Sequence, residues 1–245
     1  KKDILIITVL LLLNAYKSNM IRIFQRHCQF SSNSANKQRP KWFNRENIFD
    51  SFKKTFNDKV DYTAFYDTLN GSEHFIFNKN INIIKTEGGS EAKSFNNLLK
   101  YVYEQDFSDN DIIYFVEDDY LHLDGWIDIM LEGFNQIGAD YYTLYDHPDK
   151  YYLPMYQDLQ SKIIKTENTY WRTTPSTTCT FACKFKTFKK YFNDHLRFCS
   201  EDFTQDHQMF LHLWSIGSNL VSCMPAYSTH VEANMLSPFR EWEKI

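Results

Sequence analysis

Short apolar runs alternate with amphipathic segments along the first half of this chain, and this alternation constrains the fold more than any other feature. Strands are predicted at residues 20–25, 60–66, 81–84 and 112–116, where β-branched and aromatic residues are bounded by polar turns. Helices are predicted where apolar side chains recur every three or four residues, at 42–56, 95–102 and 126–134. Strands that alternate with helices are joined by right-handed crossovers into a mostly parallel sheet, so the predicted fold class is α/β with helices flanking a central sheet.

The pattern in the second half of the chain is less regular. Candidate strands lie at residues 141–145, 162–166, 177–182 and 220–224, and the tract at 31–36 is predicted to be a polar loop. A helix is predicted from Asp206 to Ile216. Gly217 is expected to end this helix, because glycine readily adopts the left-handed conformation that closes a helix.

Composition narrows the class of protein. Hydrophobic residues make up 43% of the chain and aromatic residues 17%, which is enough to build a large core. A net charge of −4 and a pI of about 6.1 argue against a broad basic face, so we expect no nucleic-acid partner. The five cysteines form no CxxC pair and no zinc pattern, and we interpret them as reduced thiols of a cytoplasmic protein.

The first 19 residues carry an apolar run from Ile4 to Leu13, preceded by two lysines. A membrane helix needs about 20 apolar residues, so this run is too short to span a bilayer. Two other interpretations are a signal-peptide core, although no small-residue cleavage site follows, and a buried strand. We favour an upstream extension, because Met20 opens a good first strand. The main domain would then be 20–245, and membrane association through the apolar run is not favoured.

The strongest local signal is Glu117-Asp118-Asp119, three consecutive acids directly after the apolar run that ends at Val116. Adjacent carboxylates repel one another unless a cation compensates their charge. Mg²⁺ and Mn²⁺ bind carboxylate oxygens and keep positions open for substrate phosphates, so a metal that bridges a diphosphate would fit here. The alternative is a solvated acidic turn that caps the next helix, whose first turn favours acids.

Val116-Glu117-Asp118-Asp119 resembles the DXD-type motif of GT-A glycosyltransferases, particularly the family 2-like group. Longer blocks across most of residues 20–242 are similar to one family of small GT-A-like proteins. These blocks are Arg39-Pro40-Lys41-Trp42-Phe43, Tyr114 to Trp126, Thr143-Leu144-Tyr145-Asp146-His147-Pro148, Trp171-Arg172-Thr173-Thr174-Pro175-Ser176, and Ser228-Thr229-His230 through Trp242. One departure from the usual pattern is a long polar insert between the first strand and its helix.

The resemblance implies a nucleotide-binding N-terminal half and an acceptor-binding C-terminal half. In such enzymes an acid after the second strand contacts the nucleobase, which corresponds to Asp67. The last acid of the motif binds the metal, which corresponds to Asp119, while Asp118 or Glu117 lies near the ribose or the metal's waters. A histidine from the C-terminal region corresponds to His230, so Glu117, Asp119 and His230 are the predicted metal ligands. The implied cofactor is Mn²⁺ or Mg²⁺, and the implied co-substrate is a UDP- or GDP-linked sugar.

Inverting GT-A enzymes place a general base at the start of a helix in the second half, and Asp206 is the candidate here. The alternative is that Asp206 only caps its helix, which aspartate does well, and Glu201 and Asp202 are the reserve candidates. Lys93 lies at the start of a predicted helix, where a cation suits a phosphate or a ribose hydroxyl. An exposed lysine on an amphipathic helix is an equally good interpretation of Lys93.

Two further segments have open interpretations. His147 either binds the acceptor or turns the chain, and residues 171–175 either stack on a sugar or bind phosphate, or pack as a rigid loop on the core. The predicted function is metal-dependent, inverting transfer of a hexosyl or related sugar to a hydroxyl of a glycan, lipid or protein. A nucleotidyltransferase acting on a sugar phosphate is one alternative, but residues 31–36 are not the glycine-rich basic loop that it usually carries. The other is an inactive GT-A-like carbohydrate-binding protein, against which the intact acids argue.

Overall fold

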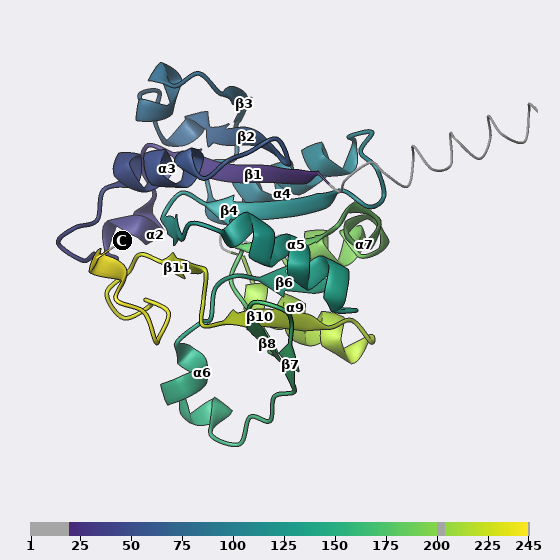
Figure 1. Cartoon of the computed structure of the whole chain (residues 1–245). Coiled ribbons are helices and arrows are strands. Elements are labelled where there is room, and N and C mark those ends of the chain that lie inside the picture. The colour runs from purple at the N-terminus through teal and green to yellow at the C-terminus, as the bar shows by residue number, and fades with distance from the viewer. Residues whose placement is uncertain (1–19, 200–203, 245) are drawn as a thin grey trace, which may run out of the picture.

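The computed structural model describes residues 20–199 and 204–244 (Figure 1). The predictions for residues 1–19 and for the reserve acids Glu201 and Asp202 lie outside these residues. The strands are β1 (Ile21–Cys28), β2 (Val60–Asp67), β3 (Asn82–Thr86), β4 (Ile112–Glu117), β5 (Tyr120–His122), β6 (Tyr141–Thr143), β7 (Ile163–Lys165), β8 (Tyr170–Thr173), β9 (Phe181–Lys184), β10 (Leu220–Met224) and β11 (Ser228–His230). The helices are α2 (Ser32–Ala35), α3 (Arg45–Lys54), α4 (Glu91–Tyr103), α5 (Trp126–Gln136), α6 (Asp149–Tyr152), α7 (Phe185–Lys190), α8 (Phe192–Arg197) and α9 (Asp206–Ser215). Single 3₁₀ turns lie at Thr68–Asn70, Phe75–Asn78, Pro154–Tyr156 and Trp242–Lys244.

Within the described ranges, nine strands form one sheet in the order β3-β2-β1-β4-β9-β6-β10-β8-β7. The four strands β3, β2, β1 and β4 are parallel to one another. Strand β9 runs antiparallel to both β4 and β6, and β8 runs antiparallel to both β10 and β7. The α/β prediction is confirmed, with the parallel arrangement concentrated at the end of the sheet formed by the N-terminal half.

Helices cover both faces of this sheet (Figure 1). One face packs against α3 and α5 through a core that contains Phe52, Trp126 and Met130. The other face packs against α4 and the helices of the second half, through a core that contains Phe95 and Phe210. The predicted apolar stripes therefore face the sheet, because burying one face of each helix removes apolar surface from water.

Local signals explain most element boundaries. Helix α3 begins at Arg45, later than the predicted 42, because the side chain of Asn44 caps it by accepting a hydrogen bond from the Asn47 amide at 2.9 Å. Helix α9 ends before Gly217, whose φ of 90° is the left-handed conformation expected there. The polar tract at 31–36 differs from its prediction, since it contains the one-turn helix α2.

The parallel strands bring their carboxyl ends to one edge of the sheet. In the register of the sheet, Cys28 of β1 lies opposite Asp67 of β2, and Arg26 of β1 lies opposite Glu117 of β4. Ligands of such sheets bind beyond this edge. A separate two-stranded ribbon of β5 and β11 places His230 opposite Tyr120 across the same end of the molecule.

Two observations concern the cysteines and the possibility of a membrane-spanning helix. All five cysteines are free, and four of them are buried, as expected for reduced thiols. Over residues 20–199 and 204–244, none of the helices has the length and apolar character needed to cross a membrane.

Candidate active site

A cavity of about 220 Å³ lies beyond the carboxyl ends of β1, β2 and β4. The polar insert after β1, the start of α4, β11 and the start of α9 complete its walls. Its charged and imidazole-bearing residues are Arg26, His27, Lys37, Arg45, Asp67, Glu91, Glu117, Asp118, Asp119, Asp206 and His230. All but one of the residues predicted for donor binding and chemistry therefore lie in one cavity.

Asp119 is the most strongly compensated acid of this cavity. Its Oδ2 lies 2.7 Å from a guanidinium nitrogen of Arg39, 3.0 Å from Nε2 of His230 and 3.1 Å from Nζ of Lys37. Burial by itself would raise the pKa of this carboxyl group, but His230, Lys37 and Arg39 together hold the pKa well below its usual range. Asp119 is therefore a carboxylate at physiological pH.

The donor set of Asp119 and His230 fits a divalent cation. Oδ1 of Asp119 is buried and has no hydrogen-bond partner among the described residues, so one lone-pair-bearing oxygen is left to bind a ligand. Nε2 of His230 lies 3.0 Å from Oδ2 of the same carboxylate, which orients the imidazole; a metal would take this nitrogen in its unprotonated form. An orphaned carboxylate oxygen beside an oriented imidazole is chemistry that Mn²⁺ or Mg²⁺ accepts.

Glu117 has a different partner from the one predicted. Its Oε1 lies 2.7 Å from a guanidinium nitrogen of Arg26, and burial raises its pKa to about 7 although Arg26 opposes that effect. Among the described residues, the trio of ligand-type side chains that lies within 4.8 Å does not contain Glu117, Asp119 or His230. In this structure the side chain of Glu117 is engaged by Arg26, and the three-ligand set remains a prediction.

That trio is His27, His74 and Asp118. The hydroxyl of Tyr62 donates to Oε1 of Gln25 at 2.8 Å, so this hydroxyl accepts the hydrogen bond from Nε2 of His27. The other ring nitrogen of His27, Nδ1, then carries no proton and lies 3.9 Å from Oδ2 of Asp118. Nε of Arg45 lies 3.6 Å from the same carboxylate. Burial raises the pKa of Asp118 to about 6 against the opposing effect of Arg45. The guanidinium group faces Oδ2 of Asp118, the oxygen that a metal of the trio would need, whereas Oδ1 of Asp119 is not engaged by its cations, so we assign no metal to the trio.

Asp67, at the end of β2, organises the loop before α4. Its Oδ1 accepts hydrogen bonds from the amides of Leu69 and Gly88, and its Oδ2 accepts one from the amide of Gly89 at 2.8 Å. A Cβ at Gly88 would lie 2.7 Å from Oδ2 of Asp67, so this close approach requires glycine. Asp67 lines the cavity, and its carboxylate shapes the wall there.

Lys93 lies away from the residues that line this cavity. It occupies the third position of α4, where its amide donates to the Ser90 side chain that caps the helix and its own side chain is exposed. The residues that α4 presents to the cavity are Ser90, Glu91 and Ser94.

Asp206 is the first residue of α9 and lies partly buried at the edge of the cavity. Its Oδ1 lies 3.1 Å from Sγ of Cys179. Burial raises the pKa of Asp206, while hydrogen bonds from Thr204 and Cys179 oppose that rise. Gln205, not Asp206, occupies the position that caps the helix, so the interpretation of Asp206 as a simple cap does not hold.

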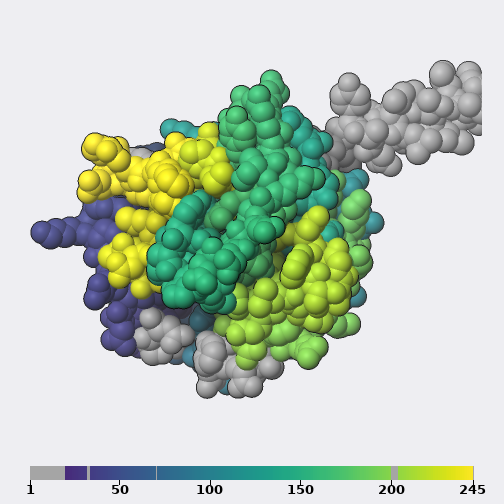
Figure 2. All heavy atoms as spheres, turned by 90° about the horizontal axis from the view of Figure 1, so that it is seen from below, coloured from purple at the N-terminus to yellow at the C-terminus, as the bar shows by residue number. Residues whose placement is uncertain are grey.

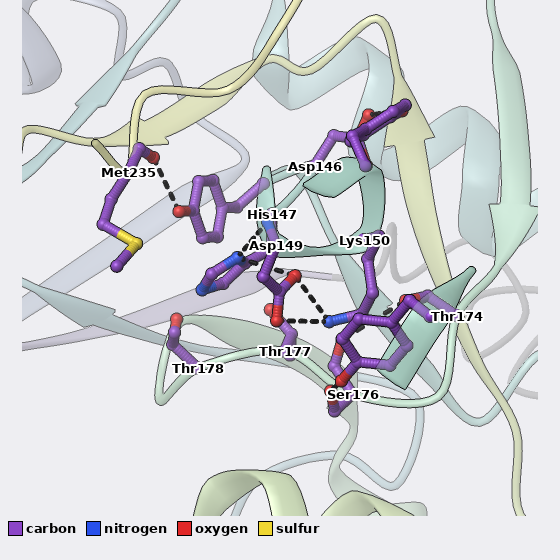
Figure 3. Close-up of polar contacts among 12 residues, drawn as sticks. Asp146, His147, Asp149, Lys150, Thr174, Ser176, Thr177, Thr178 and Met235 are labelled. Carbon is purple, nitrogen blue, oxygen red and sulfur yellow. Dashed lines mark hydrogen bonds and ion pairs between the residues drawn. The ribbon is translucent and has the colours of Figure 1, made fainter. Parts of the chain in front are cut away.

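A second cavity, of about 350 Å³, also has Asp206 in its lining, and Figure 3 shows part of its wall around His147, Lys150 and Ser176. The segment around α6, residues 176–178 and the start of α9 line it. Asp206 and Thr178 line both cavities. Viewed from below in Figure 2, the chain around α6 (green) lies between the C-terminal segment (yellow) and the α7–α9 region (yellow-green).

The structure places His147 and residues 171–175, whose roles the sequence left open. His147 lines the second cavity, and its Nδ1 lies 2.8 Å from Oδ1 of Asp149. Trp171 is fully buried in the core on the α5 side of the sheet, so it packs and does not stack on a sugar. Arg172 pairs with the buried Asp146, with a guanidinium nitrogen 2.6 Å from Oδ1, which holds β8 against the segment that leads to α6.

Sequence reasoning missed the cations that pair with the acids of the first cavity. Lys37, Arg39, Arg26 and Arg45 were assigned no role, although each contacts one of the predicted acids. The available signal was the polar insert, which departs from the usual GT-A pattern and supplies Lys37. They pair with acids about 70 to 90 positions away, which leaves no local pattern in the sequence.

This chain has the fold of GT-A glycosyltransferases. It is similar to GalNAc-T7 in a crystal structure with UDP, GalNAc and Mn²⁺, with a TM-score of 0.60 and 8% sequence identity over 90% of this chain and 46% of that chain. It is also similar to the 1–349 fragment of S. aureus TarS, with a TM-score of 0.52 and 15% identity over 85% of this chain and 59% of that chain. The chain thus spans about half the length of these neighbours. No protein-family model and no curated protein matches its sequence.

Proposed function

We propose that this protein transfers a sugar from a nucleotide-sugar donor to a hydroxyl group of an acceptor. The observation that carries the proposal is the position of Asp206, whose carboxylate lies where two cavities meet. The first cavity has the charged groups expected for a nucleoside diphosphate, and the second has room for an acceptor. A base between donor and acceptor is the arrangement that a single displacement at an anomeric carbon needs.

The roles of the first cavity follow from its contacts. Asp119 and His230 would hold a divalent cation, and Lys37 lies close enough to share in binding the diphosphate. When bound, the cation would stabilise the charge that develops on the departing diphosphate. Asp67 and the loop that it orders would form the wall for the base, and Asp118 would lie toward the ribose. Lys93 would contribute only if the donor extends beyond the start of α4.

Asp206 would act on the acceptor. Its carboxylate takes the proton of the acceptor hydroxyl as that oxygen forms a bond to the anomeric carbon. The bond from that carbon to the diphosphate oxygen breaks, and its electron pair leaves with the nucleoside diphosphate. Attack from the side opposite the leaving group inverts the anomeric configuration. A raised pKa suits this role, because a stronger base accepts the proton more readily once it is ionised.

The test uses Asp206→Asn, which keeps the size of the side chain. A positioned general base contributes about 10²–10⁴-fold in rate, so transfer should fall by about that factor while nucleotide affinity and melting temperature stay near the wild-type values. The assay supplies UDP- and GDP-sugars with Mn²⁺ and identifies the released group. Release of pyrophosphate in place of a nucleoside diphosphate would indicate nucleotidyl transfer. Wild-type transfer rates in Asp206→Asn, or a product that retains the donor configuration, would contradict the proposed base.

A further inference from the structure

The second cavity is walled mainly by hydroxyl and imidazole groups (Figure 3). Ser176, Thr177 and Thr178 form one side of it. On another side, Nδ1 of His207 lies 3.0 Å from Oγ of Ser176 and 3.2 Å from the hydroxyl of Tyr156. Burial lowers the pKa of His207, which keeps its ring neutral at physiological pH. These groups can both donate and accept hydrogen bonds, as the hydroxyls of a sugar require.

The positive charge in this cavity is neutralised within its own wall. Lys150 is the one lysine or arginine among the described residues that line the cavity. Its Nζ lies 2.8 and 3.1 Å from the two oxygens of Asp149 and 4.4 Å from the centre of the Tyr156 ring, and its side chain is 1% exposed. The charge of Lys150 is therefore compensated by Asp149 within the wall of the cavity.

The remaining formal charge of the lining is negative. Asp149 and Lys150 cancel, and Asp206 adds one carboxylate at the boundary with the first cavity. A phosphate or carboxylate group would be desolvated beside Asp206, and the described residues of the lining offer no unpaired cation to compensate it, which is unfavourable. Leu153 and Met155 supply an apolar wall that suits the C–H face of a sugar ring.

We propose that the second cavity binds a neutral saccharide as the acceptor and excludes anionic sugars such as sugar phosphates. The proposal rests on the proposed function, because it assigns the acceptor of the same reaction. Neutral hydroxyls pair with the His207–Tyr156–Ser176 network, and one hydroxyl reaches Asp206. In Figure 3 the far nitrogen of the His147 ring points away from Asp149, so it too is available to a hydroxyl.

Binding is tested separately from catalysis by saturation-transfer NMR on the full chain with UDP present. The probes are the methyl glycosides of glucose, galactose and N-acetylglucosamine and the 6-phosphates of the same sugars. We expect the wild type to bind at least one neutral glycoside and to bind its 6-phosphate at least about tenfold more weakly. Stronger binding of the phosphates would overturn the proposal.

A charge variant makes the test sharper. Asp149→Asn leaves the charge of Lys150 uncompensated in the wall, so the ratio of phosphate to neutral binding should rise by at least about tenfold. The matched control is Asp109→Asn, which removes the same group from an exposed ion pair with Lys189. If Asp149→Asn does not fold by circular dichroism, Lys150→Met replaces it and should exclude phosphates still more strongly. An unchanged ratio in the folded variant would overturn the proposal.

The same samples separate this inference from the proposed function. Release of nucleoside diphosphate from donor sugars is followed with and without each glycoside. If donors are cleaved but no neutral saccharide binds or accelerates cleavage, the acceptor assignment fails and the sugar-transfer proposal stands. If neutral saccharides bind with the expected charge dependence but no donor is bound or cleaved, the proposed function fails and the saccharide site stands.

Discussion

The ammonium nitrogen of Lys37 lies 3.1 Å from Nε2 of His230, and the same nitrogen lies 3.1 Å from Oδ2 of Asp119. These are the two side chains proposed to bind a divalent cation. Burial would lower the pKa of Lys37, but Asp119 raises it, so Lys37 keeps its charge at this position. A positive charge of the protein and a bound metal would therefore compete for the same two side chains.

Removing this competitor should strengthen metal binding. We expect Lys37→Met to raise the affinity for Mn²⁺ by about tenfold, since a like charge within a few ångströms opposes the ion. Isothermal titration of Mn²⁺ into the protein measures the change. Lys41→Met, a change of the same kind at an exposed lysine, is the control and should match the wild type. Unchanged or weaker Mn²⁺ binding in Lys37→Met would show that Lys37 and the ion do not share a site.

Two of the three acids of the motif should respond differently to neutralisation. Asp119→Asn should weaken Mn²⁺-dependent nucleotide binding by more than about 100-fold, because it replaces the ligand whose free oxygen faces the site. Glu117→Gln should weaken it much less, because the side chain of Glu117 is engaged by Arg26. Fluorescence titration of UDP with and without Mn²⁺ compares the two variants. Equal losses would indicate that Glu117 turns toward the metal after all.

The pH dependence of transfer should report Asp206. A base works only when ionised, so activity falls as the pH falls through its pKa, and burial places that pKa above the ordinary value of 3.8. Cys179→Ala removes a hydrogen bond that favours the ionised form, so the acid limb of kcat/KM should move to higher pH. Cys183→Ala is the control, since that thiol is buried outside the cavity. If the acid limb does not move in Cys179→Ala, the pKa that it reports does not belong to Asp206.

Acid should destabilise the fold partly through His195. Burial lowers the pKa of this histidine from 6.5 to about 4 although Asp194 opposes the shift, and its Nε2 lies 2.8 Å from the hydroxyl of Tyr141. Because the unfolded chain binds a proton at higher pH than the folded one, stability is lost as the pH falls from about 6.5 toward 4. The loss amounts to about 3 kcal/mol for this group. Urea unfolding at several pH values should show a shallower decline in His195→Gln than in the wild type. If the free energy of unfolding falls with pH in parallel in the two proteins, His195 does not contribute to the acid destabilisation.

Two glycines give a matched test of packing between α5 and β8. A Cβ at Gly133 would lie 2.8 Å from Cζ2 of the buried Trp171, whereas a Cβ at Gly138 would meet no atom within 4 Å. Gly133→Ala should therefore lower the free energy of unfolding by about 1–3 kcal/mol. Gly138→Ala should leave it within about 1 kcal/mol of the wild type. Equal stability of the two variants would mean that Trp171 moves aside without lowering the free energy of unfolding.

Elements with several turns or many buried residues were predictable from their periodicity. The stripe of Phe95, Leu98, Leu99 and Val102 correctly predicted α4, and the apolar run before Glu117 correctly predicted β4. The three-residue strands β5 and β11 and the four-residue helix α6 were not predicted. Segments of that length repeat no pattern of their own, and tertiary contacts specify them. Strands β6 and β7 are equally short, but they lie inside the longer runs predicted as strands at 141–145 and 162–166.

The sequence by itself determined that three acids follow a buried strand, because the apolar run and the acids are adjacent in the chain. Only the tertiary structure decided which groups those acids meet. His230 and Lys37 reach Asp119 across 111 and 82 positions, since β11 pairs with β5 and the insert after β1 folds over the end of β4. Backbone pairing between distant strands places those charges, and the burial that results sets their pKa values. Neither is encoded in any local pattern, so the partners of the acids emerge only when the sheet is assembled.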